Sequence, residues 1–451
     1  MDKNKVLAKN TIILGVGQFV PKIIAMITLP ILTKSFSTEE YGIYDLLISL
    51  ASLALPLMTL LIQQAVFRFI IEEKDKNTIN KYITNSFIFV FILSFICFII
   101  GATAAHFANV DNSLIIATFF LYFTEAIYDL LGQIARGKGE NMSFSIAVIM
   151  YSVVNMLLLL LLTVFNIVNI ITTLTIISIS YMIAAVFLWI KLHLKNDFKI
   201  KEFSSQTIKK LLIYSVPIIP SSISLWIVNL SDRLIVTYFL GASANGIYAA
   251  ASKIPNLFGT VFNVFNLAWT ELAARSIKEE DINKYYSKLF NNLYSFLIGV
   301  LLLLISFSPI LFNILIDDKF HEGYFQMPIL FIGVLFNCFV SFFGGLYIAL
   351  KKTKQVGISS LAGGLLNIII NVCLIERYGL YAASISTAVS FLIILIYRAL
   401  EIKKYIKIDY NYTSIAIGVV FLILSMIIFY NNTIIAIIFN IIIAIIYNLF
   451  F

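Results

Sequence analysis

Apolar stretches of about twenty residues recur along the whole chain, from Thr11 to the C-terminus. About twenty helical residues are needed to cross a hydrocarbon core of roughly 30 Å. Backbone groups in lipid must bond internally, and the alternating pattern of a barrel is absent, so these stretches are expected to be helices. The charged share of 12% is about half that of a soluble domain. The chain is therefore predicted to be an all-α integral membrane protein.

The stretches predict about fourteen transmembrane helices, in two sets of six followed by a final pair. The first set is expected near residues 10–34, 42–68, 83–107, 113–135, 143–165 and 167–190. The second set and the pair are expected near 211–239, 245–273, 289–316, 324–350, 356–375, 380–398, 412–430 and 432–451. This predicts an N-lobe over 1–192, a linker over 193–210, a C-lobe over 211–406 and two further helices over 407–451.

Lysine and arginine are concentrated in every second loop between these helices, which places them on one side of the membrane. Short cytoplasmic loops retain positive charge whereas exported loops do not. With the N-terminus inside, 26 of the 32 basic residues fall on the inner side, and Lys34, Lys319 and Arg377 fall in outer loops. Both termini and the linker are thus predicted to be cytoplasmic. The net charge of +8 follows from this topology and predicts no nucleic-acid partner, because the basic residues form no single stripe.

Several chemical motifs are missing from the sequence. Cys97, Cys338 and Cys373 each lie inside an apolar run and are predicted to be small core residues, with neither disulfide nor metal spacing. No phosphate-binding loop of the G-x-x-x-x-G-K-[ST] type occurs, so ATP hydrolysis by this chain is not expected. We expect no cofactor and no metal, and an ion or proton gradient remains as the energy source.

An internal repeat relates the two halves. Gly42-Ile-Tyr44 and Gly246-Ile-Tyr248 lie 204 residues apart, each at the start of the second helix of its half. Six helices per half is an even number, so the halves keep one orientation and should be related by an axis along the membrane normal. The substrate path is then expected between the halves.

A polar stripe marks the span near 245–273. Its residues are spaced three, four and three apart and therefore share one helical face: Lys253, Asn256, Thr260 and Asn263. An offset of 204 gives a matching face on the second span, which Asp45 and Gln63 extend. Such a face meets either a cavity or a neighbouring helix through hydrogen bonds. Its recurrence in both halves favours a shared cavity.

The first and seventh spans carry polar residues at a matching depth. These are Gln18 and Lys22 on the first span, and Asn229 and Arg233 on the seventh. A charge at mid-membrane costs roughly 2.5–3.5 kcal/mol on insertion scales. Lys22, Arg233 and Lys253 therefore need a wet cavity or a partner, and we expect all three to face one region.

Prolines occur next to these cations, with Pro21 beside Lys22 and with Pro217 and Pro220 before Arg233. Proline frees backbone carbonyls and allows a helix to bend. Bending is what a rocking transporter needs, although prolines are common in membrane spans.

Acidic residues also enter the membrane. Glu125 and Asp129 lie one turn apart on the fourth span, and with Asp45 they are candidates for carrying protons or ions. The alternative is that the acids neutralise Lys22 or Arg233 structurally. We favour that alternative for Asp232, because it points off the polar face.

The chain resembles the polysaccharide-transporter (Wzx-type flippase) branch of the multidrug/oligosaccharidyl-lipid/polysaccharide exporter superfamily, over nearly its whole length. The most specific part is Asn229-Leu-Ser-Asp-Arg-Leu-Ile235, followed by Gly241 and Asn245-Gly-Ile-Tyr-Ala-Ala-Ala-Ser-Lys253. The resemblance implies two six-helix lobes around a central cavity. It also implies movement of a polyprenyl-diphosphate-linked oligosaccharide from the inner to the outer leaflet by alternating access, for surface polysaccharide assembly.

By the same resemblance, Lys22, Arg233 and Lys253 would hold the diphosphate. The remaining substrate-binding candidates are the neutral polar residues of the same faces: Gln18, Asn229, Asn256, Thr260 and Asn263. The implied partners are the lipid-linked oligosaccharide, membrane lipids and polysaccharide assembly proteins, in a bacterial plasma membrane.

Two other functions compete with this one. A multidrug antiporter of the same superfamily would export cations through an acidic cavity. Three basic residues at the predicted cavity favour an anionic headgroup instead. Glu125 and Asp129 keep the antiporter as an alternative. A membrane-embedded glycosyltransferase or polymerase would need a sizeable loop with catalytic carboxylates. The longest loop here is the basic inner one.

Overall fold

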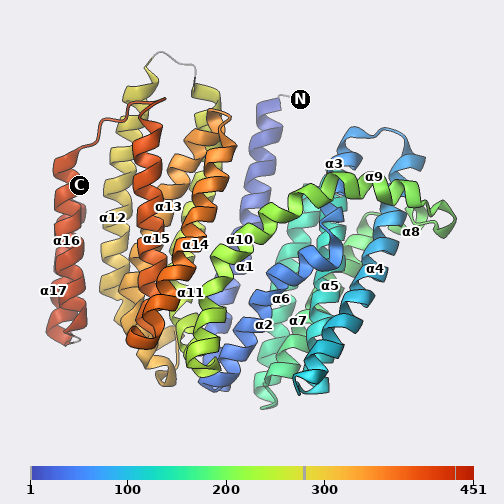
Figure 1. The fold of residues 1–451 in the computed structure, drawn as a ribbon, viewed down its shortest axis with the longest axis horizontal. Helices are drawn as coiled ribbons and strands as arrows, with labels where there is room; N and C mark the ends of the chain where they lie inside the picture. Colours follow the sequence, from blue (N-terminus) through green and yellow to red (C-terminus); the bar gives the residue numbers. More distant parts are fainter. Residues whose placement is uncertain (1–2, 278–280, 432, 451) are drawn as a thin grey trace. The chain divides into compact units, whose positions relative to one another are not determined.

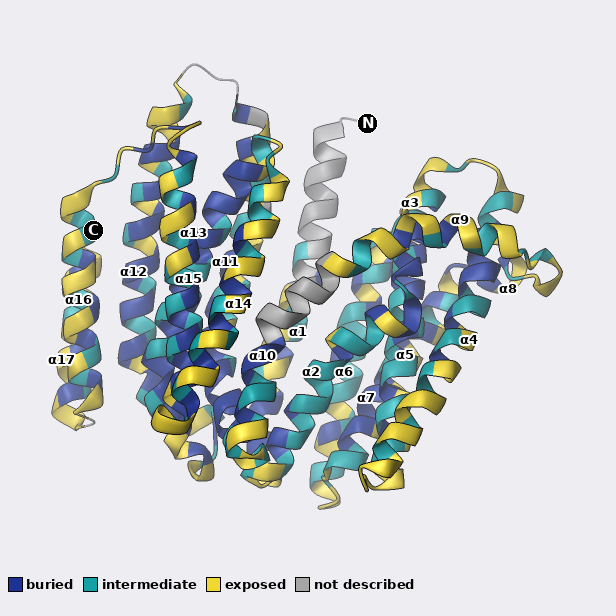
Figure 2. Ribbon diagram, in the orientation of Figure 1, coloured by how far each residue is buried: buried dark blue, intermediate teal, exposed yellow. Residues whose placement is uncertain are grey.

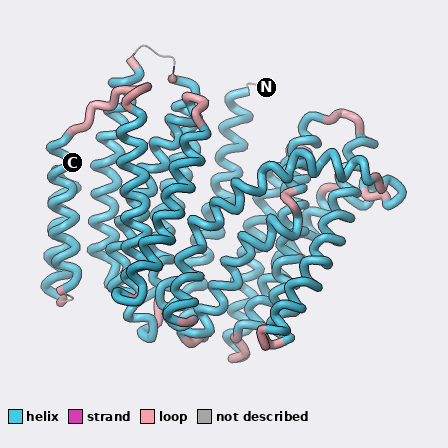
Figure 3. Tube along the Cα trace, viewed as in Figure 1, coloured by secondary structure: helices cyan, strands magenta, loops and turns pink. Residues whose placement is uncertain are grey.

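The computed structural model describes residues 3–277, 281–431 and 433–450, which form helices joined by short loops (Figures 1 and 3). These ranges contain no strand. Ten of their helices are long and apolar enough to cross a membrane by length and composition. When short helices α3, α8 and α9 are set aside, fourteen of the seventeen α-helices remain, one for each predicted span. The prediction of an all-α membrane protein with about fourteen spans is confirmed.

Contacts within the chain divide it into two compact units. Unit 1 comprises residues 1–36 and 43–230. It contains α1 (Lys3–Ser35), most of α2 (Thr38–Thr59), α3 (Ile62–Glu72), α4 (Lys76–Phe107), α5 (Asn112–Gly137), α6 (Asn141–Val164), α7 (Ile170–Lys191), α8 (Leu194–Asp197), η1 (Ile200–Glu202), α9 (Ser205–Ser215), η2 (Val216–Ile218) and the first half of α10 (Ile219–Leu240).

Unit 2 comprises residues 37–42 and 231–451, so the first residues of α2 and the second half of α10 belong to it. It also contains α11 (Ala242–Ser276), α12 (Ile282–Leu315), η3 (Asp318–Gln326), α13 (Met327–Ala349), α14 (Thr353–Tyr378), α15 (Leu380–Ile402), α16 (Tyr412–Tyr430) and α17 (Ile434–Phe450).

Side-chain caps set the starts of several helices. Asp75 accepts hydrogen bonds from the backbone N–H groups of Asn77 and Thr78 at the start of α4, and Asn169 forms a reciprocal capping box with Thr172 at the start of α7. These bonds satisfy donors that have no partner within the helix. The Thr78 hydroxyl, which contributes most, and the two backbone N–H groups that donate to Asp75 hold the pKa of its carboxyl below the usual value.

The core of unit 1 forms around α5. Leu130, Leu131 and Ile134 are fully buried on this helix, where they share a cluster with apolar residues of α3, α4, α6 and α7. Exposed apolar residues such as Phe91, Phe95 and Ile99 line the opposite face of α4. An outward apolar face is expected of a helix whose solvent is lipid.

The core of unit 2 forms around α13, which is mostly buried (Figure 2). Trp269 of α11 stacks on Phe342 with ring centroids 4.5 Å apart, and its indole N–H donates to the Phe342 carbonyl at 2.9 Å. Arg398 of α15 is buried and donates to the Val340 carbonyl of α13 at 2.9 Å and to Ser359 of α14 at 2.9 Å. One guanidinium thus ties three helices together through neutral acceptors.

The second predicted span, 42–68, is wrong as one continuous helix. α2 ends at Thr59 and α3 begins at Ile62, because Leu60 and Leu61 adopt positive φ angles of 45° and 55°. The Thr59 hydroxyl replaces lost helical bonds: it donates to the Leu55 carbonyl at 2.8 Å and accepts from the Leu61 N–H at 3.1 Å. A threonine side chain can compete with the helix in this way.

The seventh predicted span, 211–239, is also interrupted. α9 ends at Ser215, the 3₁₀ turn η2 covers Val216–Ile218, and α10 begins at Ile219. Pro217 and Pro220 lack the N–H groups that would continue the α-helical bonds. At these prolines the chain changes from α-helical to 3₁₀ hydrogen bonding, and the dihedral angles of Ser215 and Ile219 on either side stay helical.

The linker is fastened to unit 1 near the start of α4 and the end of α5. The Asn85 amide of α4 donates to the Glu202 carbonyl at 2.9 Å and accepts from the Ser204 N–H at 2.7 Å. Lys138 pairs with Asp197 of α8 at 2.5 Å. The segment therefore has fixed partners on α4 and α5 rather than the fully solvated backbone of a flexible tether.

The glycines of the two repeated triplets meet inside unit 2. A Cβ atom on Gly42 would lie 1.8 Å from the Ala242 carbonyl oxygen, and one on Gly246 would lie 1.9 Å from the Thr38 carbonyl oxygen. The two contacts are equivalent under the offset of 204. The Asn245 amide also donates to the Gly42 carbonyl at 2.9 Å. Small residues allow helix backbones to approach this closely.

We predict that Gly42→Ala and Gly246→Ala each destabilise the protein by roughly 1–3 kcal/mol, the usual cost of overpacking. The added methyl group meets a backbone oxygen, which cannot rotate away, and this outweighs the better helix propensity of alanine. Thermal unfolding of purified protein measures the effect. Gly101→Ala is the matched control, because its added Cβ would have nothing within 4 Å, and equal melting temperatures for all three variants would contradict the prediction.

Topology yields a second prediction. Ser204 is half-buried and caps α9, so Lys199, whose side chain is exposed, is the better linker position for a cysteine. In a background without native cysteines, Lys199→Cys should resist a membrane-impermeant maleimide added to intact cells. Asn112→Cys, in a predicted outer loop, should react. The reverse labelling pattern would overturn the predicted orientation.

Candidate functional site

The polar stripe of α11 lies on an accessible face of unit 2. Asn256 and Asn263 are exposed, and Lys253 and Thr260 are half-buried. The apolar residues Ile254, Phe258 and Phe262 are buried on another face of the same helix. The Thr260 hydroxyl donates to the Asn256 carbonyl of its own helix at 3.0 Å. The stripe is therefore available to a ligand or to water.

The remaining substrate-binding candidates lie on α1 and α10. Lys22 is exposed on α1 in unit 1, and Arg233 is half-buried on α10 in unit 2. Gln18 and Asn229 lie outside the residues whose side chains the structure describes. Lys253 shares unit 2 with Arg233, while the grouping of these two cations with Lys22 stays a prediction.

An acidic cluster lies inside unit 1, where α5 faces α3, α6 and α7. The Gln63 amide of α3 donates to the Asp129 carboxylate at 2.9 Å. Glu125, one turn away, is within hydrogen-bonding reach of the Tyr181 hydroxyl. Tyr181 stacks on Tyr151 with ring centroids 4.1 Å apart and an interplanar angle of 7°. The helices thus enclose two carboxylates among neutral polar groups.

Two polar atoms of this cluster are buried without a hydrogen-bond partner among the described residues: the Tyr128 hydroxyl and the Gln63 Oε1 atom. A buried polar group left unpaired costs about 1–3 kcal/mol. A proton, a water or a small cation beside Glu125 and Asp129 would complete these bonds. Asp45 is buried on α2 in the same unit, and its part in ion coupling stays a prediction.

A second acidic cluster, in unit 2, was not anticipated from the sequence. Asp232 accepts hydrogen bonds from Asn371 of α14 at 2.9 Å and from Thr387 of α15 at 2.5 Å. Asn367 of α14 donates to Thr387 at 3.0 Å. These donors are neutral, and Arg233 also interacts electrostatically with the Asp232 carboxylate. The expectation that Asp232 serves to neutralise a cation stays a prediction.

The Tyr248 hydroxyl, 16 residues away, also donates to Asp232 at 3.4 Å. Asn371 and Thr387 lie more than 130 residues from Asp232 in the sequence, so spacing alone could not assign them. One signal was present, because Asn367 and Asn371 lie one turn apart in an otherwise apolar helix. Amides in such a helix face a polar partner inside the protein. The Asn371 Oδ1 atom is buried without a hydrogen bond among the described residues, so this cluster also has unfilled bonding capacity.

The fold and these sites define a multi-pass membrane transporter. Its fold is similar to that of the lipid II flippase MurJ in an inward closed conformation, with a TM-score of 0.75 at 14% identity over 97% of this chain and 98% of that one. It is also similar to an inward-facing multidrug resistance MATE family transporter of the MOP superfamily, with a TM-score of 0.65 at 15% identity over 87% and 94% of the two chains.

The chain belongs to the polysaccharide biosynthesis protein family, whose model matches residues 7–270, more than half of its length. The MatE family model matches residues 217–373. An uncharacterized membrane protein of the archaeon Methanocaldococcus jannaschii, MJ1375, is 26% identical over 89% of this chain and 99% of its own length. The chain is thus a transporter of the MOP superfamily, which includes lipid-linked flippases, and the resemblance seen in the sequence is confirmed. The two similar structures are those of a flippase and a multidrug transporter.

We predict that the unit 1 cluster couples transport to an ion gradient. Replacing both acids by their amides, as Glu125→Gln with Asp129→Asn, keeps the shape but removes the negative charge that a proton or cation would compensate. Transport by the double variant in proteoliposomes should no longer depend on an imposed proton or sodium gradient.

The control for this prediction is Glu140→Gln, at the exposed start of α6, which should keep the gradient dependence of the native protein. A double amide variant that still responds fully to the gradient would assign Glu125 and Asp129 a structural role.

Proposed function

We propose that the chain flips a polyprenyl-diphosphate-linked oligosaccharide from the inner to the outer leaflet by alternating access, for surface polysaccharide assembly. The observation that carries the proposal is the accessible stripe of α11, where one lysine is followed by hydroxyl and amide groups along a single face. A diphosphate requires positive charge, and a sugar requires neutral hydrogen-bonding groups. The family match and the MurJ-like fold support the same class of substrate.

Charge sign favours this substrate over the cations that a multidrug antiporter exports. Lys253 and Arg233 are the charged residues of the α11 stripe and of the predicted polar face of α10. Glu125 and Asp129 instead lie among Gln63 and the tyrosines inside unit 1. They are therefore better placed for a proton or small ion than for a bulky organic cation, which needs a roomy pocket.

Headgroup binding must differ between the two states of the transport cycle. A ligand with equal affinity for both states shifts neither and is held in place. Lys22 lies in unit 1, whereas Arg233 and Lys253 lie in unit 2. The cations are therefore expected to contact the diphosphate differently in the two states, which favours release.

We predict that neutralising any one of Lys22, Arg233 and Lys253 with glutamine weakens headgroup binding by about tenfold or more, since a hydrogen bond to a charged group contributes about 1.5–3 kcal/mol. Arg233→Lys should also reduce transport, because lysine lacks the planar fork that holds two phosphate oxygens. Flipping of a fluorescent polyprenyl-diphosphate saccharide in proteoliposomes measures both effects.

The matched control removes three exposed linker lysines, Lys195, Lys199 and Lys201, and should flip normally. A properly inserted triple variant of Lys22, Arg233 and Lys253 that keeps full activity would refute the headgroup site. If the cations instead neutralise acids, then removing Arg233 together with Asp232 would restore activity. Uptake of a cationic dye with no flipping of the saccharide would favour the antiporter.

A further inference from the structure

The linker helix α9 presents two different faces. Ile208, Leu211, Leu212 and Ser215, at helical spacing, are buried or half-buried toward α3 and α4. The opposite face carries a second stripe at the same spacing, which we call the outer stripe of α9: Gln206, Lys209, Lys210, Ile213 and Tyr214. It is accessible along its length, with Ile213 67% and Tyr214 40% exposed.

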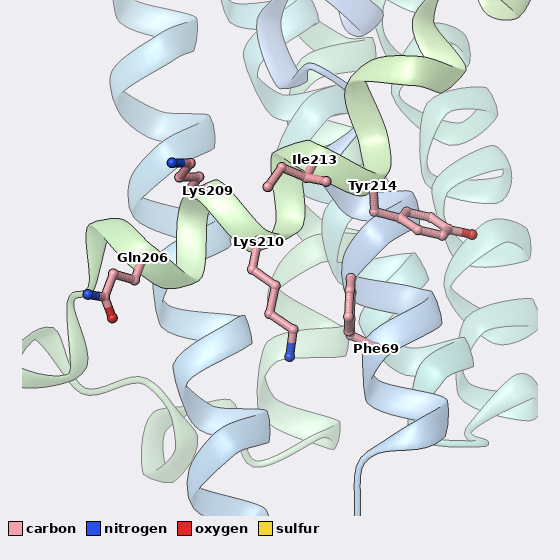
Figure 4. A pocket seen from close by; sticks show the side chains of 6 residues that line it. All are labelled: Phe69, Gln206, Lys209, Lys210, Ile213 and Tyr214. Carbon is pink, nitrogen blue, oxygen red and sulfur yellow. The ribbon is translucent and has the colours of Figure 1, made fainter.

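The outer stripe borders a surface hollow of about 480 Å³, which Phe69 of α3 completes (Figure 4). Lys210 extends beside the Phe69 ring, and its ammonium lies 4.8 Å from the ring centroid. The same ammonium donates to the Tyr82 hydroxyl at 2.7 Å. Tyr214 packs edge-on against Phe69 with centroids 5.8 Å apart. Aromatic contacts thus fix one lysine at the hollow, and Figure 4 shows Lys209 pointing from α9 in a different direction from Lys210.

Nearby acids have partners of their own. Glu72 pairs with Arg68 at 2.5 Å, and Glu202 pairs with Lys81 at 3.8 Å. Among the described residues, neither Lys209 nor Lys210 has a carboxylate within ion-pair distance. The hollow therefore has net positive charge, and an anion that enters it displaces no acidic side chain.

The hollow lies near the start of α4, a helix that is long and apolar enough to cross a membrane. Tyr82 is six residues from the charged start of α4 at Lys76, or about 9 Å along the helix axis. Exposed apolar and aromatic side chains interspersed with lysines are the signature of a helix that lies in the membrane interface. Ile213 and Tyr214 would reach acyl chains while the lysines reach phosphates.

We propose that the outer stripe of α9 and Phe69 form a binding site for the headgroup of an anionic glycerophospholipid. Lys209 and Lys210 bind its phosphate, Gln206 bonds its polar headgroup, and Ile213 and Tyr214 contact the upper part of its acyl chains. A zwitterionic lipid lacks the net charge that the lysines match, and a water-soluble phosphate lacks the apolar part that the rest of the stripe matches.

Purified full-length protein in nonionic detergent is titrated with phosphatidylglycerol, and binding is followed through the rise in melting temperature. Each lysine near a membrane surface contributes about fivefold to binding of anionic lipid. Lys209→Gln with Lys210→Gln should therefore weaken the apparent affinity by roughly 25-fold. Lys199→Gln with Lys201→Gln makes the same charge change in the same linker outside the hollow and should leave the affinity within about twofold of the native value.

Three further ligands separate the possible sources of phosphate. Phosphatidylcholine should bind weakly to all variants, and inorganic phosphate should not raise the melting temperature. Equal loss of phosphatidylglycerol binding in both double variants, or equal stabilisation by inorganic phosphate, would overturn the proposal. So would a result in which the Lys209 and Lys210 variant loses polyprenyl diphosphate binding alone.

A single substitution tests the proposal even if the double variant misfolds. Lys209→Gln keeps the contacts of Lys210 with Phe69 and Tyr82 and should weaken phosphatidylglycerol binding by about fivefold; an unchanged affinity in this folded variant would contradict the proposal. Binding is measured without transport, so failure here is distinct from failure of the flippase function.

Discussion

Two helix interruptions among the described residues depend on one constraint: backbone N–H and C=O groups have no water to bond inside a membrane. At the break after Thr59, a threonine hydroxyl serves as both acceptor and donor for the freed groups. At the break after Ser215, two prolines simply lack the donor that would go unpaired. The chain thus departs from α-helical bonding where a side chain bonds the freed backbone groups or where proline has no N–H group to leave unpaired.

The same constraint acts on buried side chains, and it explains why each unit encloses an acid among neutral donors. Asp129 in unit 1 accepts from Gln63, and Asp232 in unit 2 accepts from Asn371 and Thr387. Neutral donors stabilise a carboxylate without balancing its charge. Arg136 and Arg233 add an attractive positive charge near Asp129 and Asp232, respectively. Arg398 shows the converse arrangement, a cation held by carbonyl and hydroxyl oxygens.

Local sequence patterns were enough for the helices and not for the sites between them. Hydropathy located the long helices, ten of which meet the length and composition of a membrane span among the described residues, because a membrane imposes one length and one secondary structure. It missed the break at Leu60 and Leu61, because leucine is a good helix former and the positive φ angles depend on Thr59. The stripe of α11 followed from spacing within one helix. Asn371 of α14 and Thr387 of α15 donate to Asp232, and no rule of spacing joins residues so distant in sequence.

The fastened linker also determines where the chain can deform. Bonds from Asn85 to Glu202 and Ser204, and the pair of Lys138 with Asp197, hold this segment against α4 and α5. A segment held at several points is stiff. The first place after it with fewer helical bonds is Val216–Ile218, so mechanical compliance is concentrated in one short turn rather than spread over twenty residues. A displacement of α10 would then occur mainly as a rotation about the Val216–Ile218 turn, while the linker keeps its contacts with α4 and α5.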